Sequence, residues 1–302
     1  MNTILEINHL SKKYKDFTAV DDLSFSVNSG DVYGFLGQNG AGKSTTIRMM
    51  LTLIEPTSGD IKIFGKSLHE NRHDILSKIG AVIERPDLYK YLTAYENLKL
   101  FAKMSNVHVT HKLLMDQLDM VGLADRSDSK VKTYSQGMKQ RLGIGIALVH
   151  NPDLIILDEP TNGLDPQGIA DIRNLILKLS TEMGKTVVVS SHLLSEIELI
   201  ANRMIVIHKG KKIVEGFVKD LLDPSKTLVE IETTDNEFAK SVLKNSSFGQ
   251  MIVDKNNKLQ LTINKIEISS LIKIMVDSNV QIIAVTPRHS LEDYFLNLTK
   301  TA

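Results

Sequence analysis

The fold is decided by the stretch VYGFLGQNGAGKST, residues 32–45. Its central part, residues 37–44, matches the phosphate-loop pattern G-x-x-x-x-G-K-[ST]. An apolar strand-like run over 32–36 precedes the pattern, and a helical pattern over 45–53 follows it. Glycines let backbone N–H groups turn toward phosphate oxygens, and the helix start adds a partial positive charge. The sequence therefore predicts an α/β domain that binds a nucleoside triphosphate.

The motif gives its residues separate tasks. Lys43 is placed to reach the β- and γ-phosphates, and the Ser44 hydroxyl to ligate Mg²⁺. The alternative is a chance glycine-rich turn, against which the strand before the motif and the helix after it both argue. The predicted nucleotide contacts of this segment are Gly37, Gln38, Asn39, Gly40, Ala41, Gly42, Lys43, Ser44 and Thr45.

A second buried run, LIILDE over residues 154–159, ends in two carboxylates. It places Asp158 and Glu159 at the carboxyl edge of the sheet, where α/β folds bind ligands. Asp158 suits the shell of a magnesium ion, and Glu159 suits a general base that orients or deprotonates the attacking water. A strand ending in Asp-Glu often only exits to solvent, but downstream of a phosphate loop the catalytic interpretation is favoured. Together the two motifs indicate a nucleoside triphosphatase.

Three further segments are similar to motifs of one known family. Residues 134–141, YSQGMKQR, look like a variant of the ABC signature LSGGQ. Residues 162–166, NGLDP, look like the D-loop and contain Asp165. Residues 190–192, SSH, end the next strand, where the family has its switch histidine, here His192. Taken singly, each has an ordinary structural interpretation, such as a helix N-cap, a turn or a structural histidine.

The order of these segments after a phosphate loop resembles the ATP-binding subunit of an ABC transporter, over roughly residues 1–220. Tyr14 stands where that family stacks an aromatic ring on adenine, although it could simply pack. The resemblance implies that His192 contacts the γ-phosphate. It also implies ATP and Mg²⁺ as ligands, an integral-membrane permease as partner, and a peripheral position on the cytoplasmic face of the membrane.

The same resemblance implies a dimer with a second copy or a homologous ATP-binding subunit. Two such subunits meet head to tail and enclose two ATP molecules, so that the phosphate loop of one faces the signature of the other. In this sequence the signature contacts are Ser135, Gln136, Gly137 and Met138. ATP then joins the subunits, and hydrolysis releases them.

Three positions, in two segments, depart from the family pattern. Gln136 replaces the usual first glycine of the signature, and Met138 replaces its glutamine. Glu84 follows the strand over 79–83, where the family usually has a glutamine that touches Mg²⁺ and the attacking water. Glu84 is therefore a third candidate metal ligand, unless the alignment is shifted or the change is neutral. A glutamate here resembles bacitracin-type and lantibiotic-immunity subunits, which implies export of an antimicrobial peptide or another amphiphile.

Composition narrows the function further. Lys plus Arg and Asp plus Glu both number 36, and this balance argues against a general nucleic-acid binder. The chain has no cysteine, which excludes disulfides and thiolate chemistry. Its apolar runs are far too short to span a bilayer, so if the protein works at a membrane, another chain must cross it.

The sequence disfavours two alternative functions. A non-transport ABC ATPase of DNA repair is disfavoured, because such proteins carry long coiled-coil or zinc inserts and this chain has neither coiled-coil heptads nor cysteine. A non-transport ABC ATPase of the ribosome is disfavoured, because such proteins usually carry two ATPase domains and this chain has one phosphate loop. A regulatory binder that does not hydrolyse ATP is disfavoured, because Asp158, Glu159 and His192 are all present.

The expected architecture has two domains. Residues 1–222 form the ABC ATP-binding domain, an α/β phosphate-loop core with an N-terminal antiparallel β patch and a helical subdomain inserted at about 87–150. Residues 223–302 form a small α+β domain whose β-α-β-β-α-β order is that of a ferredoxin-like unit. A final helix is expected over 291–298.

Overall fold

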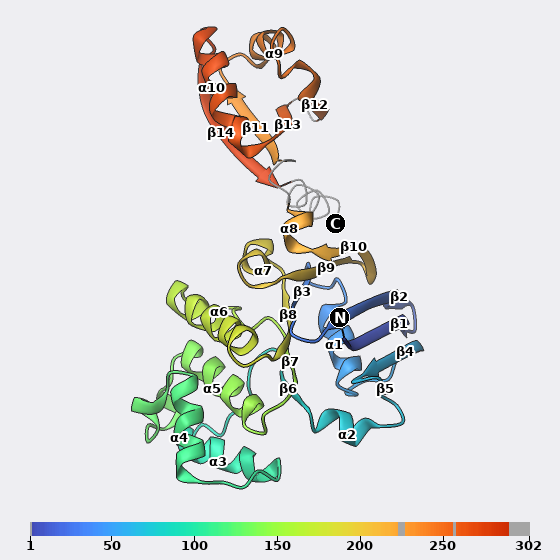
Figure 1. Ribbon diagram of the computed structural model, residues 1–302, viewed down its shortest axis with the longest axis vertical. Helices are drawn as coiled ribbons and strands as arrows, with labels where there is room; N and C mark the ends of the chain where they lie inside the picture. Colours follow the sequence, from blue (N-terminus) through green and yellow to red (C-terminus); the bar gives the residue numbers. More distant parts are fainter. Residues whose placement is uncertain (1, 223–226, 256–257, 290–302) are drawn as a thin grey trace. The chain divides into compact units, whose positions relative to one another are not determined.

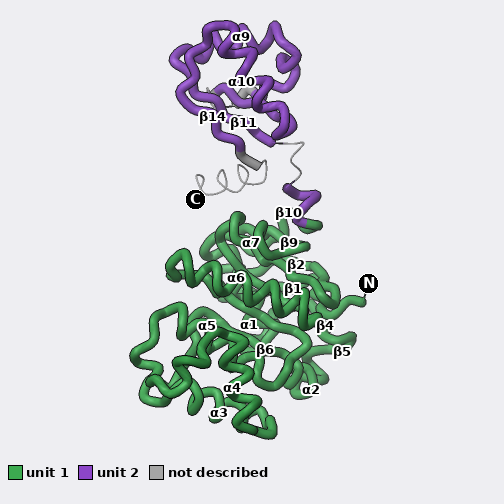
Figure 2. The backbone as a smooth tube through the Cα atoms, turned by 60° about the vertical axis from the view of Figure 1, so that its left-hand side comes forward, with its two compact units in different colours: residues 1–217 green, residues 218–302 purple. Residues whose placement is uncertain are grey.

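The computed structural model describes residues 2–222, 227–255 and 258–289. The chain forms two compact units, Met1–Phe217 and Val218–Ala302 (Figure 2). The helix expected over 291–298 lies outside the described residues. No helix of the described residues is long and apolar enough to cross a membrane.

A six-stranded sheet forms the centre of the first unit, in the order β10-β9-β3-β8-β7-β6 (Figure 1). Every pair in it is parallel except β10 with β9. All residues of β3, β7 and β8 are buried, as expected for strands covered on both faces. The strands are β3 (Val32–Gly37), β6 (Ile79–Val82), β7 (Leu154–Leu157), β8 (Thr186–Ser191), β9 (Arg203–His208) and β10 (Lys211–Phe217).

A second sheet of the same unit is antiparallel and confirms the predicted N-terminal β patch. Its strands are β1 (Thr3–Tyr14), β2 (Phe17–Asn28), β4 (Ser58–Ile63) and β5 (Lys66–Ser67), in the order β2-β1-β4-β5. Its alternating apolar residues, such as Leu5, Ile7 and Ile63, join one core with Phe35 of the parallel sheet. Helix α1 (Lys43–Met50) contributes Ile47 and Met50 to this core.

The helices of the predicted insertion are α3 (Ala94–Met104), α4 (His111–Met120) and α5 (Gln136–Leu148), with short 3-10 turns between them. Thr93 starts α3 with a reciprocal capping box, in which Glu96 N donates to Thr93 Oγ1 and Thr93 N donates to the Glu96 carboxylate. The remaining helices of the first unit are α2 (Arg72–Leu76), α6 (Pro166–Thr181) and α7 (Leu194–Ile200). In Figure 1, α5 and α6 lie on the opposite side of the parallel sheet from α1.

The second unit begins with α8 (Val218–Leu221) and then follows the element order expected from the sequence. Its sheet has the order β12-β13-β11-β14, with every neighbouring pair antiparallel. Val229, Leu261 and Leu271 are fully buried in a core of its own. Its elements are β11 (Thr227–Thr233), α9 (Asn236–Lys244), β12 (Ile252–Lys255), β13 (Lys258–Ile263), α10 (Ile268–Asp277) and β14 (Ile282–His289).

Candidate nucleotide-binding site

Three neighbouring parallel strands bring the predicted catalytic segments to one edge of the sheet. Strand β8 lies between β3 and β7. The phosphate loop follows β3, Asp158 and Glu159 follow β7, and His192 follows β8. Because parallel strands end at the same edge, residues far apart in the chain meet there.

Two glycines of the phosphate loop have the left-handed backbone conformation that glycine permits. Gly40 and Gly42 have φ angles of 79° and 106°, which a residue with a side chain rarely adopts. A Cβ atom at Gly42 would lie 2.6 Å from the carbonyl oxygen of Ala19. Gly42 also precedes α1, whose first residues are Lys43 and Ser44. The loop therefore ends at a helix N-terminus, a favourable place for phosphate.

Lys43 is nearly buried, with 5% of its surface exposed. Its ammonium donates to the carbonyl oxygens of Gly37 at 2.6 Å and Gln38 at 3.2 Å. It also lies 3.0 Å from Glu159 Oε1. The two residues predicted to bind phosphate and to activate water are thus in direct contact.

Asp158 and Glu159 are held by the end of β8. Asp158 Oδ1 accepts a 2.6 Å hydrogen bond from Ser190 Oγ, and Ser190 Oγ accepts one of 2.8 Å from the backbone N–H of Glu159. Glu159 has a φ of 48°, an uncommon conformation that these contacts hold in place. Its Oε2 lies 2.8 Å from Nδ1 of His192. The structure therefore brings together Lys43, Glu159 and His192.

One carboxylate oxygen in this cluster lacks a partner. Asp158 is completely buried, and its Oδ2 has no hydrogen-bond partner within the described part of the chain. A buried carboxylate oxygen left unpaired is costly, and it is the type of atom that ligates a hard cation. This atom fits a magnesium site beside the phosphate loop.

The signature residues begin α5. Ser135 is the N-cap, and its Oγ accepts from the backbone N–H of Met138 at 3.2 Å. Gln136 donates from Nε2 to the carbonyl oxygen of Asn162, also at 3.2 Å. A Cβ atom on Gly137 would lie 3.8 Å from Cα of Gly168, an ordinary contact distance, so the neighbouring residues do not require glycine here. Ser135 and Gln136 are exposed at the start of α5.

Two further predicted nucleotide contacts, Tyr14 and Asp165, lie at the ends of regular elements. Tyr14 ends β1 with 45% of its surface exposed, and the ammonium of Lys12 lies 5.0 Å from its ring centroid. Asp165 caps α6, where its Oδ1 accepts from the N–H of Gly168 at 3.1 Å.

Glu84 contacts a cation of the protein. Its Oε1 lies 2.7 Å from Nη2 of Arg48, and 62% of the Glu84 side chain is exposed. Arg48 is on α1, one helical turn after Ser44. Glu84 has a φ of 55°. The ion pair therefore links the position of the family glutamine to the helix that carries the phosphate loop.

Sequence reasoning assigned no role to five residues that hold the site: Arg48, Thr161, Ser190, Ser191 and Glu196. The signal available for the two serines was their place at the end of a buried strand, where a hydroxyl needs a partner. Their partners are distant in the chain, so only the tertiary structure reveals them.

Known proteins are similar to this chain in both sequence and fold. The ABC transporter family model matches residues 20–162. The bacitracin transport ATP-binding protein BcrA of Bacillus licheniformis is 41% identical over 301 residues, which cover 99% of this chain and 98% of BcrA. The lantibiotic transport ATP-binding protein SrtF of Streptococcus pyogenes is 43% identical over 212 residues, which cover 70% of this chain and 90% of SrtF.

A solved structure agrees with these relatives. The ATP-binding cassette MJ0796, a dimer in a post-hydrolysis state bound to ADP and Pi, superposes with a TM-score of 0.65 at 28% identity. The superposition covers 71% of this chain and 99% of MJ0796. With the phosphate loop and the Asp158–Glu159 pair at one sheet edge, these likenesses show that the chain belongs to the ATP-binding proteins of ABC transporters.

Proposed function

We propose that the chain binds and hydrolyses Mg²⁺-ATP and thereby drives a separate membrane permease that exports an antimicrobial peptide or a related amphiphile. The observation that carries the ATPase proposal is the meeting of Lys43, Glu159 and His192 at the carboxyl ends of β3, β7 and β8. A phosphate-binding cation and a general base in contact are the elements that phosphoryl transfer to water needs.

Ser44 and Asp158 are the proposed holders of Mg²⁺, with Glu84 as a third candidate. The unpartnered Oδ2 of Asp158 supports this assignment. When bound, the ion supplies positive charge that offsets the charge of the phosphate oxygens. In the structure Glu84 Oε1 contacts Arg48 at 2.7 Å, so Arg48 competes with the ion for this carboxylate.

Glu159 is the proposed general base. His192 holds Glu159 Oε2 at 2.8 Å, and Lys43 holds Oε1 at 3.0 Å. When Lys43 turns to a phosphate, Oε1 becomes available to orient a water and accept its proton. His192 stays close enough to fix the carboxylate and to contact the γ-phosphate.

The remaining predicted contacts complete the proposal. Tyr14 stacks on adenine, and the phosphate-loop N–H groups bind the phosphates. Ser135, Gln136, Gly137, Met138 and Asp165 act on the nucleotide of a second subunit, across a head-to-tail dimer. Exposure of the first α5 turn supports this arrangement, and MJ0796 was solved as a dimer.

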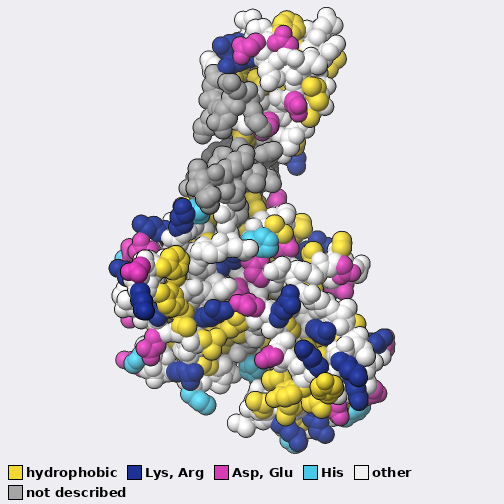
Figure 3. Space-filling view, turned by 180° about the vertical axis from the view of Figure 1, so that it is seen from behind, with side chains coloured by type: hydrophobic (Ala, Val, Ile, Leu, Met, Phe, Trp, Pro, Cys, Tyr) yellow, Lys and Arg dark blue, Asp and Glu magenta, His cyan; other side chains and the backbone are white. Residues whose placement is uncertain are grey.

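Export of a peptide antibiotic rests on the relatives. BcrA and SrtF are named for bacitracin and lantibiotic transport. Glu84 in place of the family glutamine supports the same subgroup. On the face drawn in Figure 3, basic and acidic side chains both occur over the first unit, which supports a protein partner rather than nucleic acid.

Three parts of the proposal concern organisation. The ATP-binding domain spans residues 1–222, and the accessory domain spans 223–302 with a ferredoxin-like fold. Its strand order β12-β13-β11-β14 supports this fold. The protein works at the cytoplasmic face of the membrane, held there by its permease.

The test combines biochemistry with cell assays. The purified chain should hydrolyse ATP only when Mg²⁺ is present. Cells that express it with its permease should survive higher bacitracin or lantibiotic concentrations than cells that express the Glu159→Gln variant. ATPase activity without any change in resistance would remove the export proposal and leave the ATPase proposal standing.

A further inference from the structure

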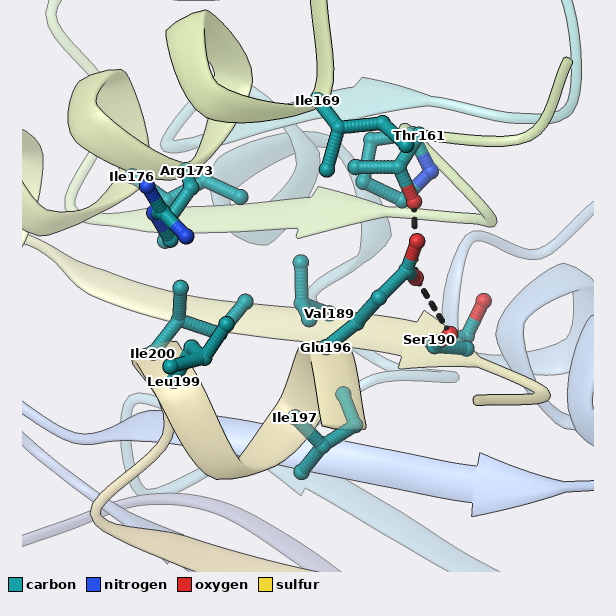
Figure 4. Close-up of a pocket in the computed structure, with 12 residues that line it drawn as sticks. Thr161, Ile169, Arg173, Ile176, Val189, Ser190, Glu196, Ile197, Leu199 and Ile200 are labelled. Carbon is teal, nitrogen blue, oxygen red and sulfur yellow. Dashed lines mark hydrogen bonds between the residues drawn. The ribbon is translucent and has the colours of Figure 1, made fainter. Parts of the chain in front are cut away.

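Glu196 receives two hydroxyl hydrogen bonds on one carboxylate oxygen. Thr161 Oγ1 donates to Glu196 Oε2 at 2.8 Å, and Ser191 Oγ donates to the same atom at 2.7 Å (Figure 4). Glu196 lies in the first turn of α7. Both distances lie in the usual range for O–H···O hydrogen bonds.

The two donors lie next to Glu159 and His192, Thr161 in the loop after β7 and Ser191 at the end of β8. Thr161 follows Glu159 by two residues, and Ser191 directly precedes His192. Glu159 and His192 are themselves 2.8 Å apart across the same two segments. The segments at the ends of β7 and β8 are therefore joined twice, once by the catalytic pair and once by Glu196.

The connection through Glu196 helps to hold the strained backbone of Glu159. Glu159 has a φ of 48°, and a residue in such a conformation persists only where its surroundings hold it. Ser190 holds it from one side through the Glu159 N–H. Glu196 holds the continuation of the same loop at Thr161, on the other side of the strained residue.

Ser191 extends the connection toward His192. Its Oγ donates to Glu196 and accepts a 3.0 Å hydrogen bond from the backbone N–H of Leu193. The Glu196 carboxylate thus fixes the direction of the Ser191 hydroxyl, and the hydroxyl fixes the backbone on the far side of His192. Linked hydrogen bonds of this type strengthen one another.

The surroundings of Glu196 are mainly apolar. It lines a pocket of about 30 Å³ together with Ile169, Ile176 and Val189 (Figure 4). Arg173 lines the same pocket, yet Glu196 forms no ion pair with it or with any other described residue. The contacts that the structure shows for the Glu196 carboxylate are therefore the two hydroxyl groups.

We propose that Glu196 is a positioning residue of the ATPase reaction, which through Thr161 and Ser191 holds Glu159 and His192 in the relative positions that hydrolysis requires. The inference rests on the proposed function. The hydrogen bonds of Glu196 go to Thr161 and Ser191 and not to the phosphate loop, so its loss is expected to slow the chemical step and to leave nucleotide binding unchanged.

The experiment measures kcat and KM for ATP, together with the thermal midpoint, in full-length variants. Glu196→Ala removes the acceptor, and we expect kcat to fall by roughly ten- to a hundredfold, the worth of one or two charge-assisted hydrogen bonds. KM should stay within about twofold, because binding energy lost only in the transition state lowers kcat alone. Glu182→Ala is the matched control, since Glu182 is exposed at the end of α6.

Two further variants separate positioning from folding. Glu196→Gln keeps an acceptor oxygen of the same shape and should restore most of the lost kcat. Thr161→Val combined with Ser191→Ala removes both donors, and adding Glu196→Ala to that pair should cause no further loss, because the interacting groups share one network.

The outcomes distinguish the possibilities. A Glu196→Ala variant with wild-type kcat overturns the inference, as does one whose kcat falls only in step with its thermal midpoint and ATP affinity. If the wild-type chain itself does not hydrolyse ATP, the proposed function fails. If the wild type hydrolyses ATP, Glu159→Gln does not, and Glu196→Ala equals the wild type, the inference alone fails.

Discussion

The ammonium of Lys43 lies 3.0 Å from the carboxylate of Glu159, and only 5% and 14% of the two side chains are exposed. A buried ion pair of this kind costs desolvation that its mutual attraction must offset. The residue proposed to bind phosphate is thus also the partner of the proposed base. On that proposal, ATP draws Lys43 from Glu159 toward its phosphates, and several consequences can be measured.

Lys43→Ala removes the charge-assisted contact to phosphate, so ATP-dependent dimerisation should be abolished. The affinity for Mg²⁺-ATP should fall by at least roughly tenfold, since one such contact is worth about 1.5–3 kcal/mol. Calorimetry gives the affinity, and gel filtration with ATP gives the dimer. Lys99→Ala, an exposed lysine of α3, is the control. Equal affinity in wild type and Lys43→Ala would refute the phosphate-loop assignment.

Glu159→Gln retains the shape of the side chain but cannot accept a proton. Hydrolysis should fall by roughly two to four orders of magnitude, the usual contribution of general-base catalysis. Nucleotide binding should persist, because the phosphate loop is untouched. The variant should therefore accumulate as an ATP-bound dimer in gel filtration. Wild-type turnover in this variant would exclude Glu159 as the base.

The Glu84–Arg48 ion pair leads to a prediction about Mg²⁺. A carboxylate beside the triphosphate repels it unless the metal is present, so ATP affinity should depend more steeply on Mg²⁺ in the wild type than in Glu84→Gln. Arg48→Gln releases Glu84 from its 2.7 Å contact and should steepen that dependence further. ATP affinity across a Mg²⁺ titration tests both variants.

A parallel cell assay tests whether Glu84 couples ATP hydrolysis to export by the permease. Glu84→Gln restores the residue that is usual in the family, so ATPase activity should change little while export falls. Superimposable Mg²⁺ titrations together with unchanged export would mean that Glu84 neither binds the metal nor couples to the permease.

The second unit should be dispensable for nucleotide binding. It has a core of its own, and the nucleotide site is built wholly from the first unit. A chain that ends at Leu222 should remain folded and bind Mg²⁺-ATP with an affinity close to that of the full chain. Circular dichroism and calorimetry check the two properties. Loss of all nucleotide binding in the truncated chain would show that the units depend on one another.

The raised pKa of Tyr33 predicts that the free energy of unfolding falls at high pH. Burial raises the pKa of Tyr33 well above its ordinary value of 10, and the negative charge of Glu215, which accepts from the Tyr33 hydroxyl, raises it further. The folded state therefore holds this proton more tightly than the unfolded state. Its contribution to stability is complete below about pH 10 and is lost as the pH rises toward the folded pKa.

The matching measurement compares urea unfolding of the wild type and Tyr33→Phe between about pH 9 and pH 11. The wild type should lose stability more steeply over this range, because Phe has no proton to lose. Parallel curves for the two proteins would contradict the shifted pKa.

The sequence predicted the parts of the site that lie in continuous motifs. The phosphate loop, the Asp158–Glu159 pair and the strand before His192 could be placed because each combines a buried strand with polar residues at its end. The helical insertion and the N-terminal β patch were predicted for similar reasons. Strand β10 was not predicted, since Lys211 and Lys212 are exposed at a sheet edge and give no clear alternation.

The contacts between motifs could not be predicted. Arg48 and Glu84 are 36 residues apart, and Thr161 and Glu196 are 35 apart. Neither pair carries a local signal, because each residue taken alone reads as an ordinary exposed polar side chain. Only the packing of β7 against β8, and of α1 near the end of β6, decides which of them meet.

Adjacent serines at the end of β8 serve opposite sides of the strand, Ser190 toward Asp158 and Ser191 toward Glu196. Because side chains alternate along a strand, deleting one residue of β8 before Ser190 would exchange the two sides. The hydroxyl groups would remain, and the apolar strand could still pack, yet each serine would face the wrong carboxylate. The number of residues between Thr186 and Ser191 therefore decides which carboxylate each serine meets.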